Sequence, residues 1–432
     1  MRGICIFEDG GHTGLLPLTH NRASYELRLG MYTLLDRILQ QYPGRHPVTL
    51  FAREDIAGTL GERHPHQVNT LDPDADGYLF INGRALDLHP VPLEGEDEVG
   101  ICRDTIVYVR LSRKNWREMS PDLFMAENGK NRRKTSEILP TSLPSIKVRD
   151  VDAGFIDYPW DIIKNNRAAL EKDCGVFTTG RKKQGQALDG VHMLNPQGVF
   201  LGKNATVKPG CVLDAGQGSI YIGNDVEIMP NAVIIGPAYV GDGSAVMPGA
   251  RLRGGSNIGP GCKVGGEISN SILHSYSNKQ HDGFIGDSYL GSWVNIGAGT
   301  VTSNLKNTYG TVKVRLNKGK KLVDTGMMFF GSVIDDHTKI GINSSLDAGT
   351  LISCHCNVAG RSPIPKYLPP FSWFTDQRQQ VYNMRKAFIT ASTAMARRGK
   401  AMSAAEEELY RRLFARTAPE RKGMKKVTPP MQ

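Results

Sequence analysis

Aliphatic residues recur at every sixth position through the second half of the chain. Two runs keep this period, one at Ile222, Ile228, Ile234, Val240, Val246, Leu252, Ile258 and Val264, the other at Ile334, Ile340, Leu346, Ile352 and Val358. An amphipathic helix, with a period of about 3.6, and a simple strand, with a period of about 2, both fit poorly. A period of six fits one short strand plus one corner, and three such units make one coil of a parallel β-helix. The pattern predicts a left-handed parallel β-helix over residues 196–362.

The first part of the chain follows a different pattern. Three apolar runs predict buried strands, at residues 3–7, 48–52 and 78–81, and residues 25–41 predict a helix. Strands that alternate with helices indicate an α/β domain, which we place at residues 1–172. A linker is then expected at residues 173–195.

Beyond the predicted coil, residues 363–370 contain four prolines and are not expected to continue it. Helical patterns follow at residues 376–398 and 404–414. Residues 416–432 are basic and contain several prolines, which predicts a disordered tail. Together these segments form a C-terminal helical extension over residues 363–432.

Composition narrows the range of partners. The 432 residues include 48 glycines and only 7% aromatic residues, which favours a repeated fold with many turns. A net charge of +10 suits an anionic small molecule, and no nucleic-acid recognition motif accompanies it. Seven cysteines without a CxxC pair indicate reduced thiols, and no apolar run is long enough to cross a membrane. A cytoplasmic protein is expected.

The strongest local motif lies between the two aliphatic runs. Residues 279–287 read Lys-Gln-His-Asp-Gly-Phe-Ile-Gly-Asp, and residues 294–304 continue it from Val-Asn-Ile-Gly-Ala-Gly-Thr. This stretch resembles the bifunctional family that combines glucosamine-1-phosphate acetyltransferase with N-acetylglucosamine-1-phosphate uridylyltransferase. The resemblance extends over residues 250–360, and downstream of residue 304 it is closest to the two-domain archaeal-type members.

The resemblance implies that the β-helix moves an acetyl group from acetyl-CoA to an amino-sugar phosphate such as glucosamine-1-phosphate. His281 matches the family's general base, which the reaction needs because an ammonium group is not a nucleophile. Arg253 would contact the sugar phosphate, while Asn295 and Asn304 would hold the sugar. Phe284 stands beside the sugar where the family usually has tyrosine, so a hydroxyl contact is lost.

The same resemblance assigns the acetyl-CoA site to Ala298, Ser332, Ala348 and Arg361. Backbone N–H groups at the two alanines would face the thioester carbonyl, where negative charge develops. Members of the family assemble as homotrimers, and the same is expected here. Structural interpretations stay open, because a corner histidine can be simply solvated and asparagines often form ladders inside such coils.

The first 22 residues resemble a degenerate form of the phosphate-binding loop of the sugar nucleotidyltransferases. Gly10 and Gly11 follow the first strand and would let backbone N–H groups approach phosphates, while Arg22 holds the place of a phosphate-binding lysine. After the strand at residues 78–81 the family presents Gly-Asp, whose carboxylate binds Mg²⁺. Here the residues are Asn82, Gly83 and Arg84.

Further on, residues 159–166 resemble the closing motif of the archaeal-type members, where an aspartate also serves the metal. Asp152 and Asp157 are the candidates, with Mg²⁺ as the implied ion. The N-terminal domain as a whole resembles a divergent subgroup of sugar nucleotidyltransferase-like proteins with a Rossmann-like fold. Whether it still uses a nucleoside triphosphate stays open.

Three functional hypotheses follow. The first is an acetyl-CoA-dependent amino-sugar acetyltransferase with a divergent nucleotidyltransferase domain. The second is an active sugar-1-phosphate nucleotidyltransferase in which the β-helix is structural. The third is a non-catalytic protein that binds a sugar nucleotide. A zinc-dependent hydratase on the same fold is disfavoured, because the spacing of the histidines does not match that family.

Overall fold

A computed structural model describes residues 1–86, 88–117, 146–178, 184–317, 321–360, 363–376 and 378–426. The chain divides into two compact units. Unit 1 contains residues 1–27 and 32–158, and unit 2 contains residues 28–31 and 159–432. No helix within the described ranges is both long and apolar enough to cross a membrane.

Unit 1 is an α/β domain built on a mixed seven-stranded sheet. Its strands, in spatial order, are β10 (Lys147–Asp150), β8 (Glu98–Cys102), β9 (Thr105–Ser112), β6 (Gly77–Asn82), β1 (Gly3–Phe7), β4 (Val48–Phe51) and β5 (Gln67–Val68). Strands β1, β4, β5 and β6 run parallel, whereas β9 is antiparallel to both of its neighbours. All five residues of β1 are buried, as expected for a central parallel strand. The predicted α/β class is confirmed.

The helices of unit 1 are short. They are η1 (Gly10–Leu15), η2 (Ser24–Glu26), α1 (Leu34–Leu39), α2 (Glu54–Arg63) and α3 (Arg113–Trp116), and a small antiparallel pair joins β7 (Ala85–Leu86) to β11 (Gly154–Phe155). The helix predicted at residues 25–41 is therefore wrong over most of its length. Gly30 has a φ of 63°, which a right-handed helix cannot contain, so the helix begins only after this glycine.

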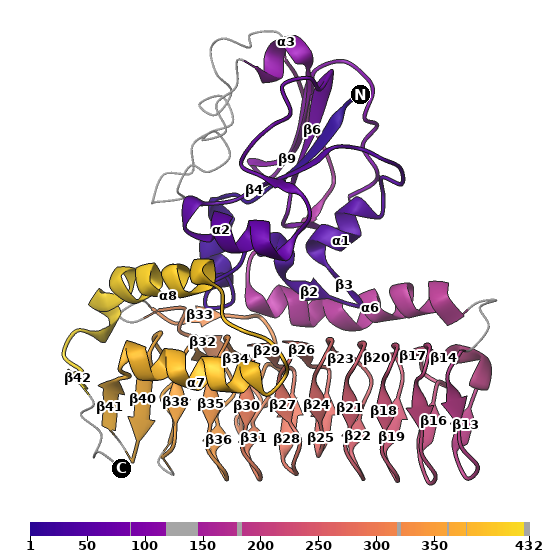
Figure 1. The fold of residues 1–432 in the computed structure, drawn as a ribbon, viewed down its shortest axis with the longest axis vertical. Coiled ribbons are helices and arrows are strands. Elements are labelled where there is room, and N and C mark those ends of the chain that lie inside the picture. The colour runs from indigo at the N-terminus through magenta and orange to yellow at the C-terminus, as the bar shows by residue number, and fades with distance from the viewer. Residues whose placement is uncertain are drawn as a thin grey trace. The chain divides into compact units, whose positions relative to one another are not determined.

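Unit 2 is a parallel β-helix of the predicted hexapeptide type, in which three sheets form the faces of a triangular coil. The first face contains β12 (Gln186–Ala187), β15 (Thr206–Val207), β18 (Glu227–Ile228), β21 (Ala245–Val246), β24 (Lys263–Val264), β27 (Asn278–Lys279), β30 (Asn295–Ile296), β35 (Lys339–Ile340), β38 (Asn357–Val358) and β40 (Ser372–Thr375). Figure 1 shows successive strands stacked along the coil.

The second face contains β13 (His192–Leu194), β16 (Val212–Asp214), β19 (Val233–Ile235), β22 (Arg251–Leu252), β25 (Glu267–Ser269) and β28 (Phe284–Gly286), and the pair β31 (Val301–Thr302) and β36 (Ser345–Leu346) continues it. The third face contains β14 (Val199–Leu201), β17 (Ile220–Ile222), β20 (Ala238–Val240), β23 (Ser256–Ile258), β26 (Ile272–Ser275), β29 (Tyr289–Ser292), β34 (Ser332–Ile334), β37 (Thr350–Ile352) and β39 (Tyr367–Leu368). A hairpin of β32 (Lys313–Val314) and β33 (Val323–Asp324) is inserted between β31 and β34.

The interior of the coil is one continuous hydrophobic core. Every aliphatic residue of the two six-residue runs belongs to it, and each is at most 2% exposed. Lys279 is the exception to the aliphatic pattern, because β27 pairs it with Val264 at an inward position. Burial of aliphatic side chains in stacked coils is therefore the main source of stability in unit 2.

The helix α6 (Pro159–Thr178) packs along the start of the coil, against β14, β17, β20 and β23 (Figure 1). Asn166, which is fully buried, donates from Nδ2 to the carbonyl oxygen of Gly255 at 2.8 Å and accepts from Asn257 at 2.8 Å. The predicted boundary at residue 172 falls inside this helix. Strands β12 and β13 also begin the coil within the segment predicted as a linker, followed by η3 (Pro196–Gly198).

The coil also extends beyond its predicted end. Strand β39 pairs in parallel with β37 although prolines flank it, because these prolines lie outside the two paired residues. Strand β41 (Arg378–Val381) then turns back antiparallel to β40, and β42 (Lys425–Lys426) pairs with β41. Of the segment predicted as a tail, the described residues 416–426 contain η4 (Ala418–Arg421) and β42.

Two helices cover this end of the coil, α7 (Met384–Ala396) and α8 (Ala404–Arg416). One edge of the coil carries a row of stacked rings at Tyr276, Trp293, His337, His355 and Phe371, all with positive φ. Tyr410 of α8 meets the ring of His355 edge-on at 4.3 Å. Stacked and edge-on aromatic contacts therefore attach α8 to the coil.

Truncation of one interior side chain should test the coil core. Ile258→Ala leaves a cavity in the stacked interior and should lower the free energy of unfolding of unit 2 by about 2–5 kcal/mol. Val301→Ala removes a side chain that is 37% exposed and should change it by less than about 0.5 kcal/mol. Denaturant titration followed by circular dichroism measures both. Equal effects of the two changes would contradict the assignment of Ile258 to the core.

Candidate functional site

The predicted base lies at a corner of the coil. His281 follows β27 on the first face and precedes β28 on the second face, and its side chain is exposed. Ala298 occupies the same corner one coil further on, where the N–H of Gly299 donates to the carbonyl oxygen of Asp282 at 2.9 Å. The corner thus brings the imidazole and the backbone at Ala298 into adjacent coils.

The second face carries charged groups beside this corner. Arg251 and Arg253 both pair with Glu267, at 3.5 Å and 3.2 Å. Strand register places Glu267 between Arg251 and Phe284 on adjacent coils. Arg253 is 61% exposed, so its guanidinium is accessible to an anionic ligand, and Phe284 lies one coil beyond Glu267 on the same face. Arg253, Phe284 and His281 are therefore brought together on and beside one face.

The two predicted sugar-binding asparagines are placed differently. Asn304 donates from Nδ2 to Asp287 at 2.6 Å, and Asn270 donates to the other oxygen of that carboxylate at 2.7 Å. Burial raises the pKa of Asp287 although both amides oppose the shift. Asn304 thus belongs to a structural ladder. Asn295 is exposed on the first face, not on the second face with Arg253.

The residues predicted to bind acetyl-CoA divide into available and internal groups. The backbone N–H groups of Ala298 and Ala348 donate to no other group in the described part of the chain, but Ala298 is partly exposed whereas Ala348 is buried. Ser332 is fully buried, and its N–H donates to the hydroxyl of Ser288 at 2.9 Å. Arg361 lies outside the described residues. Of the three described positions, only Ala298 has a backbone N–H that is both without a partner among the described residues and partly exposed.

Sequence reasoning missed Lys279, which lies beneath the corner that carries His281. Its side chain is fully buried, and its ammonium group donates to the carbonyl oxygens of Gly265, at 3.4 Å, and of His281. Burial lowers the pKa of Lys279 to about 8, with the charge of Asp282 opposing this shift. The sequence signal for this residue was a lysine at a position of the repeat where the side chain points inward.

Unit 1 contains a closed cluster around Arg84, at the place where the family's metal-binding aspartate is expected. The guanidinium binds both oxygens of Asp9, at 2.6 Å and 2.7 Å, and one oxygen of Asp157 at 2.5 Å. Asn82 donates to Asp9 at 3.0 Å. Burial would raise the pKa of Asp9, but Arg84, Asn82 and the N–H of Gly11 together lower it.

Mg²⁺ does not fit this cluster. Arg84 already forms ion pairs with both Asp9 and Asp157, and a Cβ atom at Gly11 would lie 2.1 Å from the guanidinium carbon, so the guanidinium occupies the space between them. Asp152 is exposed. Across the described residues, no three side chains of the kinds that bind metals converge on one point. Among the described residues, neither Asp152 nor Asp157 lies in a group of three such side chains.

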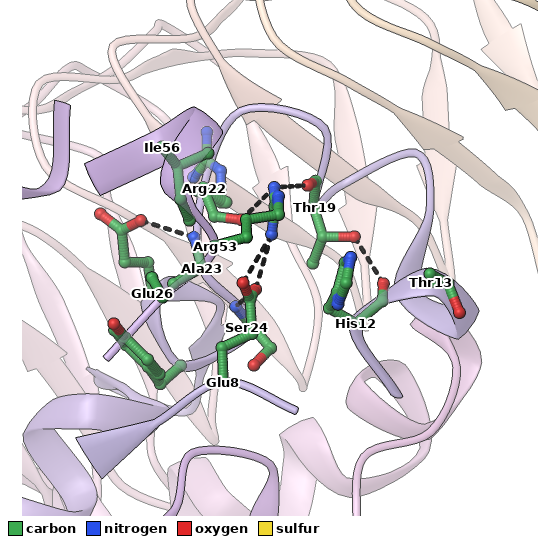
Figure 2. A network of polar contacts seen from close by, with 12 residues as sticks. Glu8, His12, Thr13, Thr19, Arg22, Ala23, Ser24, Glu26, Arg53 and Ile56 are labelled. Atoms are coloured by element: carbon green, nitrogen blue, oxygen red, sulfur yellow. Dashed lines mark hydrogen bonds and ion pairs between the residues drawn. The ribbon is translucent and has the colours of Figure 1, made fainter. Parts of the chain in front are cut away.

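The remaining phosphate-loop candidates belong to internal networks. Figure 2 shows Arg53 bound to both carboxylate oxygens of Glu8, at 2.7 Å each, and to the carbonyl oxygen of Thr19. Arg22 is 5% exposed and lies close enough to Glu26 to help lower its pKa. A Cβ at Gly83 would lie 2.5 Å from the ring of Tyr25. Gly10 is buried in η1. These residues therefore take part in the internal packing of the predicted phosphate loop.

Family models match both parts of the chain. Residues 4–182 match the family described as sugar nucleotidyl transferase, and residues 219–254 match the bacterial transferase hexapeptide, in six repeats.

Curated relatives include the bifunctional protein GlmU of Bartonella quintana, 26% identical over 60% of this chain and 55% of that protein. GlmU of Synechococcus sp. is 31% identical over 51% of this chain and 38% of that protein. A bifunctional sugar-1-phosphate nucleotidylyltransferase/acetyltransferase of Sulfurisphaera tokodaii is 33% identical over 21% of this chain and 22% of its own length. The chain therefore spans less than two thirds of each of these relatives.

Among solved structures, the UDP-N-acetylglucosamine acyltransferase of Francisella novicida is 13% identical over 57% of this chain and 94% of that chain, with a TM-score of 0.27.

Removal of the Arg84 guanidinium should destabilise unit 1, because the largely buried carboxylate of Asp9 loses its ion-pair partner. Arg84→Ala leaves Asp9 without its charge partner and should destabilise unit 1 by about 3–5 kcal/mol in denaturant titration. Asp9→Asn in the same chain removes the orphaned charge and should recover part of this loss. No recovery in the double variant would show that the carboxylate of Asp9 is not what Arg84 stabilises.

The shifted pKa of Lys279 predicts how stability depends on pH. Because the folded chain holds this proton less tightly than the unfolded chain, unit 2 should become more stable as the pH rises from about 8 to 10.5. Lys279→Met should reduce that gain, whereas Lys203→Met, at an exposed corner, should leave it unchanged. Denaturant titrations across this pH range measure the difference. An identical gain in wild type and Lys279→Met would contradict the assignment.

Proposed function

We propose that unit 2 transfers an acetyl group from acetyl-CoA to the amino group of an amino-sugar phosphate. The reason is that the chain belongs to the GlmU-like family of sugar nucleotidyl transferases with hexapeptide repeats. One observation carries the proposal. His281 is exposed at a coil corner beside an accessible cationic face and next to an unpaired backbone N–H at Ala298.

In this reaction His281 accepts a proton from the substrate's ammonium group, and the free amine attacks the thioester carbonyl. The carbonyl oxygen gains negative charge, and the N–H of Ala298 is the donor best placed to bind it near His281. As the tetrahedral intermediate collapses, the bond from carbon to sulfur breaks. The attacking nitrogen gives up its second proton, which the thiolate of CoA takes up, and a neutral amide remains on the sugar.

The acceptor is a sugar phosphate in this proposal because of the charged second face. Arg251 and Arg253 share the single carboxylate of Glu267, which leaves a net positive charge at an exposed surface. A guanidinium binds phosphate oxygens in a bidentate manner. Phe284 would contact the sugar through its ring alone, so the hydroxyl contact of a tyrosine is absent.

The proposal for unit 1 is narrower. Its family match supports an origin as a nucleotidyl transferase domain, whereas the Arg84 cluster leaves no place for Mg²⁺ between Asp9 and Asp157. We therefore assign the proposed activity to unit 2 alone. A homotrimer and a cytoplasmic location are part of the same proposal, as the family resemblance in the sequence implies.

Acetyl transfer should depend on the imidazole of His281. Purified protein with acetyl-CoA and glucosamine-1-phosphate, or another amino-sugar phosphate from a panel, should release free CoA thiol in a colorimetric assay. His281→Ala should lower kcat by about 10²–10⁴-fold, the usual contribution of a general base. His192→Ala removes an exposed histidine at the start of the coil and should leave kcat unchanged.

If the wild-type protein acetylates no acceptor in the panel, the proposal is wrong. So would a His281→Ala variant with undiminished turnover, since the base would then be another group.

A further inference from the structure

A cavity of about 490 Å³ lies between the first face of the coil and the helix α7. The coil contributes residues from β24, β27, β30 and β35 and from the corners beside them, and α7 contributes its C-terminal half. The lining residues are Lys263, Tyr276, Asn278, Gln280, Trp293, Asn295, Lys339, Ile389, Thr390, Thr393, Ala394, Arg397 and Arg398. This volume suits a small molecule rather than a few water molecules.

The charges around the cavity are all positive. Two lysines and two arginines line it, and none of the described lining residues is acidic. Arg398 donates to Asn278 Oδ1 at 2.8 Å, and Lys339 donates to the carbonyl oxygen of Trp293 at 2.6 Å. The side chains of Lys263 and Arg397 form neither a hydrogen bond nor an ion pair with other described residues. Two cationic groups are therefore available to an anion.

The uncharged lining groups favour a polar ligand with one apolar side. Asn295 and Gln280 have side-chain amides without partners among the described residues. Tyr276 and Trp293 stack on each other at 4.5 Å and supply the aromatic part of the lining. Amides beside guanidinium and ammonium groups are the donors that bind phosphate oxygens.

We propose that this cavity, which we call the α7 groove, binds a phosphorylated small molecule through Lys263 and Arg397. The groove lies on the first face, whereas Arg253 and Phe284 lie on the second, so it is a separate site from the one that holds the acceptor. The inference rests on the cavity and its unpaired cations and does not depend on acetyl transfer.

Binding is measured by isothermal titration calorimetry and by quenching of Trp293 fluorescence. The probes are adenosine 3′,5′-bisphosphate, uridine diphosphate and glucosamine-1-phosphate, each at low and high salt. At least one of them should bind, with affinity that falls as salt rises. Lys263→Gln combined with Arg397→Gln should weaken that binding at least about tenfold, since each change removes a charge-assisted hydrogen bond.

Arg385→Gln, an exposed arginine at the start of α7 outside the groove, is the matched control and should bind as wild type does. The compound that binds identifies the source of the phosphate. Trp293→Phe should abolish the fluorescence signal and keep the calorimetric one. No binding of any probe, or equal affinity in the double variant, would overturn the proposal. Acetyl transfer measured on the same double variant separates this outcome from failure of the proposed function.

Discussion

The stacking of one inward side chain on the next is the constraint on which unit 2 depends. Because the interior accepts one aliphatic residue per face in each coil, the exterior residues also align in rows. Asn278 lies next to Asn295, and Asn295 next to Lys339, by strand register alone. Arg251, Glu267 and Phe284 form a second row on another face. The interior pattern thus sets which exterior groups can act together.

The sequence predicted those parts of the fold that repeat. The aliphatic period was sufficient for the coil, because each inward residue meets the same surroundings one coil later. The two ends of the coil were not predictable in this way. Strand β13, with His192 and Leu194 exposed, lacks the aliphatic signal, and β39 lies among prolines. Gly30 interrupted the helix predicted at residues 25–41 through its positive φ, which periodicity does not record.

The candidate site was likewise predictable from the sequence only in part. A motif that continues through a corner was enough to place His281, because the corner follows from the repeat. The missing aspartate at Arg84 was visible in the sequence, but its bond to Asp157 joins residues 73 positions apart. Only the fold could show that Arg84 binds two carboxylates internally. The α7 groove likewise depends on the packing of α7, which no local pattern specifies.

The two ends of the coil differ in a way that bears on self-association. At the C-terminal end, β41 reverses direction and β42 pairs with it, so the last parallel strand has no free edge. At the N-terminal end, β12 pairs on one side only within the described ranges. An unpaired edge is a template for another strand. Both outermost strands of the first face, β12 and β42, are only two residues long, and such short edges offer little for a strand of another copy to pair with.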